Sequence, residues 1–179
     1  MNREESLNSI LERIWLHPFI PVYEYKDILT NGHFAVFTSV VPDDIKKRFH
    51  TTVINVPETA YEEAEARRYE NVLNMVLKAK VMFTKKLKKK SVVHFIPSGV
   101  LKNGDEGEEI VCMFYKKKMA EEPQVATYSQ LYYEFITTVL GCDLYHDIGE
   151  NHAYIVCRDT GEVAGLLLPV IPLISLIGD

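Results

Sequence analysis

The C-terminal third of the chain carries the sequence pattern that most constrains its fold. It opens with a β-prone run, Gln124–Ser129, whose last residue suits a helix N-cap. Apolar residues then recur at helical spacing over 130–140, and Gly141 follows where a helix end favours a left-handed backbone. Three strand-like runs separated by turn signals complete the pattern: Cys142–Ile148, Ala153–Arg158 and Glu162–Leu168. The order predicts a β-α-β-β-β unit that shapes a binding surface rather than an active site.

Three segments of this unit carry a likeness to a known family. They are the helix Leu131–Leu140, the strand Ala153–Arg158 and the apolar ending Gly165–Val170. Together they resemble the end of a DNA sliding clamp of the bacterial polymerase III beta type, which finishes in a similar Leu-Met-Pro-Val-Arg-like strand. The chain is shorter than a ring subunit with several clamp domains and continues beyond Val170. The resemblance therefore implies a clamp-like domain rather than a processivity ring.

The rest of the chain adds helices and short strands. Amphipathic periodicity predicts a short helix over Glu4–Leu16 and a long one from Glu58 to about Lys80, which residues 81–83 either extend or leave for a strand. A third short helix is expected over Pro42–Phe49. Strands are expected over Phe19–Tyr25, His33–Thr38, Thr51–Val56, Ser91–Ile96 and Ile110–Tyr115. The expected class is α+β: a mainly antiparallel sheet, one long helix, a second helix in the C-terminal unit and a short N-terminal helix.

Length and composition favour one compact domain. A chain of 179 residues with 47% hydrophobic content can bury a single core. Within it we distinguish an N-terminal mixed region with the long helix (1–83), a basic hairpin (84–123) and an acidic β-α-β-β-β unit with an apolar tail (124–179). The acidic start differs from a signal peptide, and Pro169 and Pro172 interrupt the longest apolar run. We therefore expect a cytoplasmic protein with no membrane partner.

Charge is distributed unevenly along the chain. The net charge is −5, yet residues 80–118 hold 10 basic and 4 acidic side chains, while residues 119–179 hold 1 basic and 9 acidic ones. Folding that keeps these regions apart would give a bipolar surface.

Two lysine clusters are the candidate nucleic-acid ligands: Lys85, Lys86, Lys88, Lys89, Lys90, Lys116, Lys117 and Lys118. If Ser91–Ile96 and Ile110–Tyr115 pair as a hairpin across the glycine-containing loop 97–109, the clusters meet at its open end. Ammonium groups bind phosphate oxygens without reading base sequence. The alternative is that these lysines only solvate a sheet end and block aggregation.

Two further sets are candidate protein contacts. The first is acidic and is expected to be exposed toward a basic partner: Glu134, Asp143, Asp147 and Glu150. The second is the apolar tail: Ile171, Leu173, Ile174, Leu176 and Ile177. Large aliphatic side chains gain roughly 1.5–3 kcal/mol each on burial. The tail is therefore expected to fold back on its own domain or to dock on a second copy, giving a homodimer, or on another protein.

Catalytic and metal signatures do not support an enzyme. The sequence has no P-loop, dinucleotide glycine motif, nucleophile elbow or His-Glu-x-x-His motif. We therefore expect no catalytic residues, no cofactor and no metal. Cys112, Cys142 and Cys157 are expected to be buried structural thiols rather than a disulfide or metal site. The set Cys142, Asp143, His146, His152 and Cys157 matches no zinc spacing, and strand alternation sends several of its members to opposite faces.

Two function classes fit these features. The first is a non-catalytic phage or mobile-element protein in DNA transactions, which binds nucleic acid through its basic middle and a DNA-processing protein through an acidic face. The alternative is an inhibitor of a host nuclease that blocks its nucleic-acid groove. In size, acidity and lack of catalytic motifs the chain is similar to small phage anti-CRISPR proteins.

Overall fold

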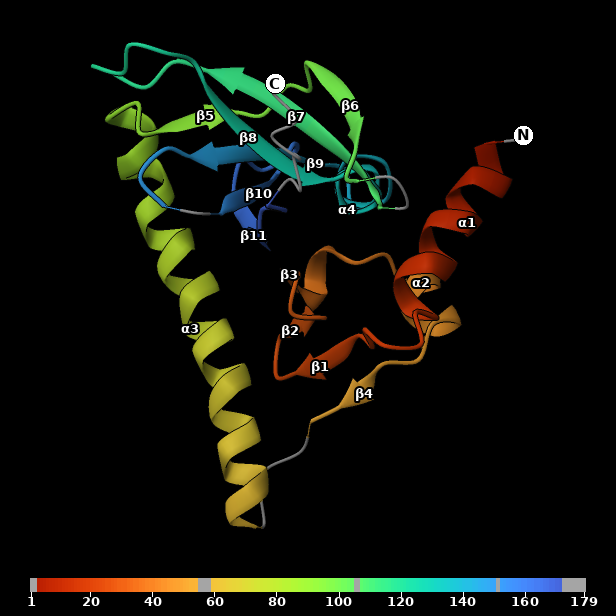
Figure 1. Ribbon diagram of the computed structural model, residues 1–179. Coiled ribbons are helices and arrows are strands. Elements are labelled where there is room, and N and C mark those ends of the chain that lie inside the picture. The colour runs from red at the N-terminus through yellow and green to blue at the C-terminus, as the bar shows by residue number, and fades with distance from the viewer. Residues whose placement is uncertain (1–2, 55–58, 105–106, 151, 172–179) are drawn as a thin grey trace.

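The structure is a computed structural model that describes residues 3–54, 59–104, 107–150 and 152–171 (Figure 1). Its helices are α1 (Arg3–Trp15), α2 (Asp43–Arg48), α3 (Ala60–Lys88) and α4 (Gln130–Glu134), with a 3-10 turn η1 (Thr38–Val40) and a π-helical turn η2 (Phe135–Val139). Its strands are β1 (Tyr23–Tyr25), β2 (Ile28–Thr30), β3 (Phe34–Phe37), β4 (Thr52–Val53), β5 (Val92–His94), β6 (Gly99–Lys102), β7 (Glu109–Tyr115), β8 (Gln124–Ser129), β9 (Cys142–Asp147), β10 (Ala153–Cys157) and β11 (Val163–Leu167).

These strands form two sheets. The larger has the order β4-β1-β2-β3-β11-β10-β9-β5, and the smaller has the order β6-β7-β8. Neighbouring strands are antiparallel everywhere except between β1 and β4. The predicted α+β class with a mainly antiparallel sheet, one long helix and shorter helices is confirmed.

Two helix-and-meander units meet at the centre of the large sheet. Helix α1 precedes β1-β2-β3, and α4 with its π-helical turn precedes β9-β10-β11. The last strands of the two units, β3 and β11, pair with each other at the centre. From that pair outward, each unit places its third strand first, then its second and then its first, so the two halves of the sheet have the same order. A Cβ atom at Gly165 would lie 2.1 Å from the Ala35 carbonyl oxygen, so only glycine permits this close pairing. The two helices also pack together.

Helices cover both faces of the large sheet. On one face, α1 buries Leu11 and Ile14 in the main core, and η2 buries Phe135 and Ile136 there. The small sheet also joins this core through Tyr128. On the other face lies α3, whose buried residues recur every three or four positions: Ala66, Tyr69, Leu73, Val76, Ala79 and Phe83. A helix of 29 residues is about 43 Å long. Eight strands are about 34 Å wide, so α3 can cross the whole sheet, as Figure 1 shows.

The C-terminal β-α-β-β-β unit has the predicted order and nearly the predicted bounds. Gly141 has a φ of +64°, as the helix end requires. Ser129 precedes the helix, but its hydroxyl makes no cap bond and instead contacts Glu108 at 3.4 Å. The helix ends in a π-turn closed by the Leu140 N–H bonding the Phe135 carbonyl oxygen at 3.1 Å.

The middle of the chain departs from the sequence prediction. Helix α3 ends at Lys88 rather than near Lys80, because the apolar spacing continues through Phe83 and lysine favours a helix. The expected loop 97–109 contains β6. The expected hairpin of Ser91–Ile96 with Ile110–Tyr115 is wrong, since β5 pairs with β9 whereas β7 pairs with β6 and β8. No described helix has the length and apolar character needed to cross a membrane.

Candidate functional site

The first lysine cluster lies where α3 ends. Lys85, Lys86 and Lys88 occupy its last turns, and the chain then reverses through Lys89 and Lys90. Lys90 has a φ of +56°, and its N–H bonds the Leu87 carbonyl oxygen at 3.0 Å. All of these lysines are exposed except Lys86. Positive side chains at this position also complement the negative end of the helix dipole.

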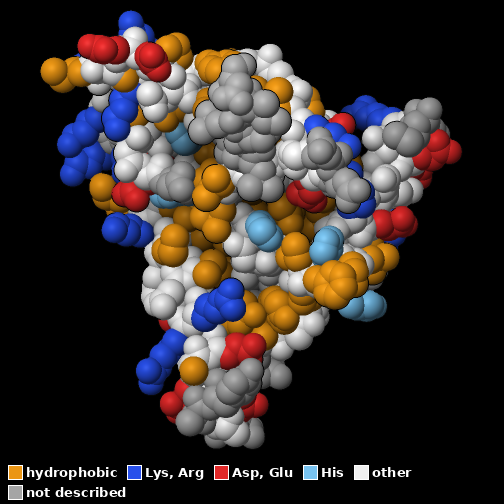
Figure 2. Space-filling model, viewed as in Figure 1, with side chains coloured by type: hydrophobic (Ala, Val, Ile, Leu, Met, Phe, Trp, Pro, Cys, Tyr) orange, Lys and Arg blue, Asp and Glu red, His pale blue; other side chains and the backbone are white. Residues whose placement is uncertain are grey.

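The second cluster, Lys116–Lys118, begins the exposed connection between β7 and β8. It starts directly after Tyr115, whose ring lies 4.9 Å from the ring of His146 in β9. His146 is the ladder partner of Val93, close after Lys90. Contacts between the two sheets thus bring the clusters to the same end of the molecule, without the expected hairpin. Lys and Arg side chains gather at that end in Figure 2, at the upper left.

Lys86 differs from the other lysines because it faces inward. Its Nζ lies 2.5 Å from the Asp147 Oδ2 and 3.6 Å from the Glu150 Oε1, and its side chain is 20% exposed. Asp147 is 1% exposed and also accepts hydrogen bonds from the Tyr154 hydroxyl and the Gly149 N–H, each at 3.0 Å. Burial disfavours the charged form of Asp147, yet the Lys86, Gly149 and Tyr154 donors lower its pKa below the ordinary value. Burial likewise opposes the charge on Lys86, but Asp147 and Tyr154 raise its pKa.

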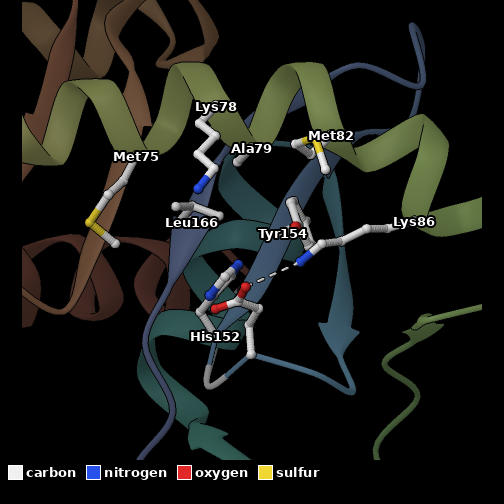
Figure 3. A pocket seen from close by; sticks show the side chains of 9 residues that line it. Met75, Lys78, Ala79, Met82, Lys86, His152, Tyr154 and Leu166 are labelled. Atoms are coloured by element: carbon white, nitrogen blue, oxygen red, sulfur yellow. Dashed lines mark ion pairs between the residues drawn. The ribbon is translucent and has the colours of Figure 1, made fainter.

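Lys86 borders a pocket between α3 and the large sheet, and Figure 3 marks its ion pair with Glu150 there. The cavity has a volume of about 230 Å³ and is lined by Met75, Lys78, Ala79, Met82, Lys86, Glu150, His152, Tyr154 and Leu166. His152 points into it, its Nε2 is buried without a hydrogen-bond partner among the described residues, and burial lowers its pKa. The Lys86 ammonium is paired with the Asp147 and Glu150 carboxylates, and His152 is neutral. The pocket therefore has apolar walls and a lysine whose charge is already compensated within the protein. We infer that the network holds the end of α3 against β9 and β10.

The network includes residues that sequence reasoning missed. The sequence marks His152 only as one member of a possible zinc-ligand set, and no motif marks Tyr154. Lys86 had a recognisable signal, because it continues the spacing of Val76, Ala79 and Phe83 on the buried face of α3. A lysine at such a position is expected to meet an acidic group.

The four acidic candidates do not form one exposed set. The expectation that Asp147 is exposed is wrong, since α3 covers it and Lys86 neutralises it. Asp143 accepts a bond from the Arg158 Nε at 2.7 Å, and Glu134 accepts one from the Gln130 Nε2 at 2.8 Å. Glu150 is exposed, although it lies within reach of Lys86.

The tail is described only as far as Ile171, which is 79% exposed. Leu173, Ile174, Leu176 and Ile177 lie outside the described residues. Before Ile171, the chain lies along β8: the Val170 N–H bonds the Thr127 carbonyl oxygen at 3.0 Å, and the Thr127 hydroxyl donates to the Val170 carbonyl oxygen at 2.5 Å.

Metal-ligand residues do not converge in the described part of the chain. There, no group of three or more His, Cys, Asp or Glu side chains could hold a metal ion. From the set considered for zinc, His146 bonds the Tyr128 hydroxyl at 2.7 Å and Asp147 bonds Lys86. Cys112 and Cys142 are buried and Cys157 is half-buried, all as free thiols.

Comparisons with protein-family models, curated proteins and solved structures found no match to this chain.

Proposed function

We propose that this chain is a non-catalytic protein that binds a nucleic-acid backbone through the lysines at the end of α3 and in the β7–β8 connection. The observation that supports this proposal is that two clusters of exposed lysines gather at one end of the molecule (Figures 1 and 2). The first cluster is Lys85, Lys88, Lys89 and Lys90, and the second is Lys116–Lys118. The proposed setting is DNA transactions of a phage or other mobile element, with a DNA-processing protein as a second partner.

The arrangement of the lysines favours a backbone over a single anion. Successive residues at the end of α3 point in different directions, and Lys116–Lys118 are all exposed in the β7–β8 connection. Each cluster can therefore offer ammonium groups to more than one phosphate. Glu121 and Glu122 follow Lys116–Lys118 in the same exposed connection and partly offset its charge. We therefore expect Lys88 and Lys89 to contribute more to binding than Lys117.

The alternative is an inhibitor that occupies the nucleic-acid groove of a host nuclease. Such mimicry would draw on exposed acids of residues 119–179. Of the four acids considered for this role, Asp147 is buried, and Asp143 faces Arg158. The lysines are therefore the better-supported interaction surface.

The test replaces Lys88, Lys89 and Lys117 with glutamine and measures binding to a short fluorescent DNA duplex by anisotropy at several salt concentrations. Each lost phosphate contact lowers the slope of log affinity against log salt by about 0.9. The triple variant should therefore bind more weakly and lose roughly 2 to 3 units of slope. Thermal melting should be nearly unchanged, because the three side chains are exposed.

A matched control removes the same charge elsewhere: Lys46→Gln and Lys47→Gln on α2, with Lys102→Gln. Lys102 is the ladder partner of Glu109, at the opposite end of β7 from Tyr115. The control should retain the affinity and slope of the unmodified protein. Equal losses in both triple variants would mean that only net charge matters. Unchanged binding in the first variant, or no duplex binding by the unmodified protein at low salt, would refute the proposed surface.

A further inference from the structure

Two cysteines face each other across neighbouring strands. Cys142 begins β9, Cys157 ends β10, and the two are direct partners in the antiparallel ladder. The adjacent pair is hydrogen-bonded, since the Arg158 N–H bonds the Gly141 carbonyl oxygen at 3.3 Å. Bonded and non-bonded pairs alternate in such a ladder, so the cysteines form a non-hydrogen-bonded pair. At the other end of the ladder, Asp147 and His152 form a hydrogen-bonded pair, because the Asp147 N–H bonds the His152 carbonyl oxygen. Alternating from that pair along β9 and β10 again makes Cys142 and Cys157 a non-hydrogen-bonded pair.

This register suits a disulfide. In a non-hydrogen-bonded pair the Cα atoms are about 4.5 Å apart and the side chains lie on the same face. A disulfide joins Cα atoms about 4.4–6.8 Å apart. The strand ends are also held together by Arg158, whose guanidinium donates to the Cys142 carbonyl oxygen at 3.0 Å and to Asp143 at 2.7 Å. Closing the bond therefore requires little movement of the backbone.

The two thiols have different environments. Cys142 is fully buried, and burial, followed by the proximity of Cys157, raises its pKa to about 12. Cys157 is half-buried. The backbone N–H groups of Thr160 and Asp159, and then the Thr160 hydroxyl, bond its sulfur and lower its pKa. These donors belong to a turn closed by the Gly161 N–H bonding the Cys157 carbonyl oxygen at 2.8 Å. One thiol is therefore accessible and activated, and the other is protected behind it.

We propose that Cys157 and Cys142 form a reversible disulfide when the protein meets hydrogen peroxide. The Cys157 thiolate attacks a peroxide oxygen, the O–O bond breaks, and the leaving oxygen departs as water after taking a proton, which leaves Cys157 as a sulfenic acid. The Cys142 thiol then loses its proton and attacks the Cys157 sulfur. The S–O bond breaks, the S–S bond forms, and the hydroxyl leaves as a second water. With hydrogen peroxide, the peroxide gains two electrons and the thiol pair loses two.

The test treats the reduced, full-length protein with hydrogen peroxide, counts free thiols after denaturation and maps cross-linked peptides by mass spectrometry. The chain has 3 cysteines, and we expect two thiols to disappear together, one Cys142–Cys157 cross-link to form, and dithiothreitol to restore both. Cys112, which is 3% exposed in the small sheet, should stay reduced. Cys112→Ser is therefore the matched control and should oxidise like the unmodified protein.

The variants separate the two roles. Cys157→Ser should keep its remaining thiols, whereas Cys142→Ser should accumulate a sulfenic acid at Cys157 that dimedone traps. A cross-link involving Cys112, retention of all thiols, or a cross-link that forms no faster in folded than in urea-unfolded protein would overturn the proposal. These three outcomes are all measured on the unmodified chain, so they decide the question even if a variant fails to fold.

Discussion

Replacing Asp147 with asparagine should destabilise the protein through a single buried ion pair. The change removes the negative charge and turns one oxygen into an amide donor that faces the Lys86 ammonium. Breaking a buried pair by changing one partner costs about 3–5 kcal/mol. We expect the lower end, about 3 kcal/mol, because Glu150 stays 3.6 Å from Lys86 and the lysine is partly solvated.

The assay is urea unfolding followed by circular dichroism. With a typical slope of about 2 kcal/mol/M, a loss of about 3 kcal/mol lowers the midpoint by about 1.5 M. The double variant Lys86→Met with Asp147→Asn should lose clearly less than the sum of the single variants, because it leaves no buried charge without its partner. Lys80→Met, which breaks the exposed pair of Lys80 with Glu162, is the control and should cost about 0–1 kcal/mol.

The pKa of Asp147 adds a pH signature. Its pKa is lowered in the folded state, so its stabilisation is complete above the unfolded value of about 3.9 and is lost as pH falls through the folded value. The asparagine variant should therefore lose less stability than the unmodified protein when the pH is lowered below about 4. Strict additivity in the double variant, or a cost for Asp147→Asn no larger than that of Lys80→Met, would refute a buried, coupled pair.

Two further predictions concern the histidines and the tail. Burial lowers the pKa of His146 and His152, so the unfolded state binds more protons and stability should fall as pH drops below about 6.5. In the double variant His146→Gln with His152→Gln, the melting temperature should depend less on pH between pH 7.5 and 5.5. An unaltered pH dependence would contradict this origin. Deleting residues 172–179 should abolish a dimer in sedimentation and nearly preserve the monomer's melting temperature if the tail is an interface, whereas a collapsed melting temperature would show that it belongs to the core.

Local signals explain which parts of the fold were predictable. The β-α-β-β-β unit is marked by a helix C-terminal glycine, a hairpin turn and apolar periodicity, all of which act within a few residues. The sheet pairings depend on distant partners, as in β3 with β11 and β5 with β9, and no local residue specifies them. The two helix-and-meander units have the same arrangement but no recognisable sequence repeat. Packing requires apolar side chains at the right spacing and not particular residues, so two units can share a fold without sharing a sequence.

The length of α3 decides the character of the candidate site. A helix that ended near Lys80 would leave Asp147 exposed and Lys86 in a basic strand connection, as the sequence interpretation assumed. The observed helix continues to Lys88, so Phe83 contacts the Tyr145 and Tyr154 rings and Lys86 reaches Asp147 one turn later. Because of the same extension, Lys88, Lys89 and Lys90 lie exposed beyond the sheet edge, near the β7–β8 connection. One helix end therefore determines both which lysine is neutralised inside the protein and which lysines remain available to a phosphate backbone.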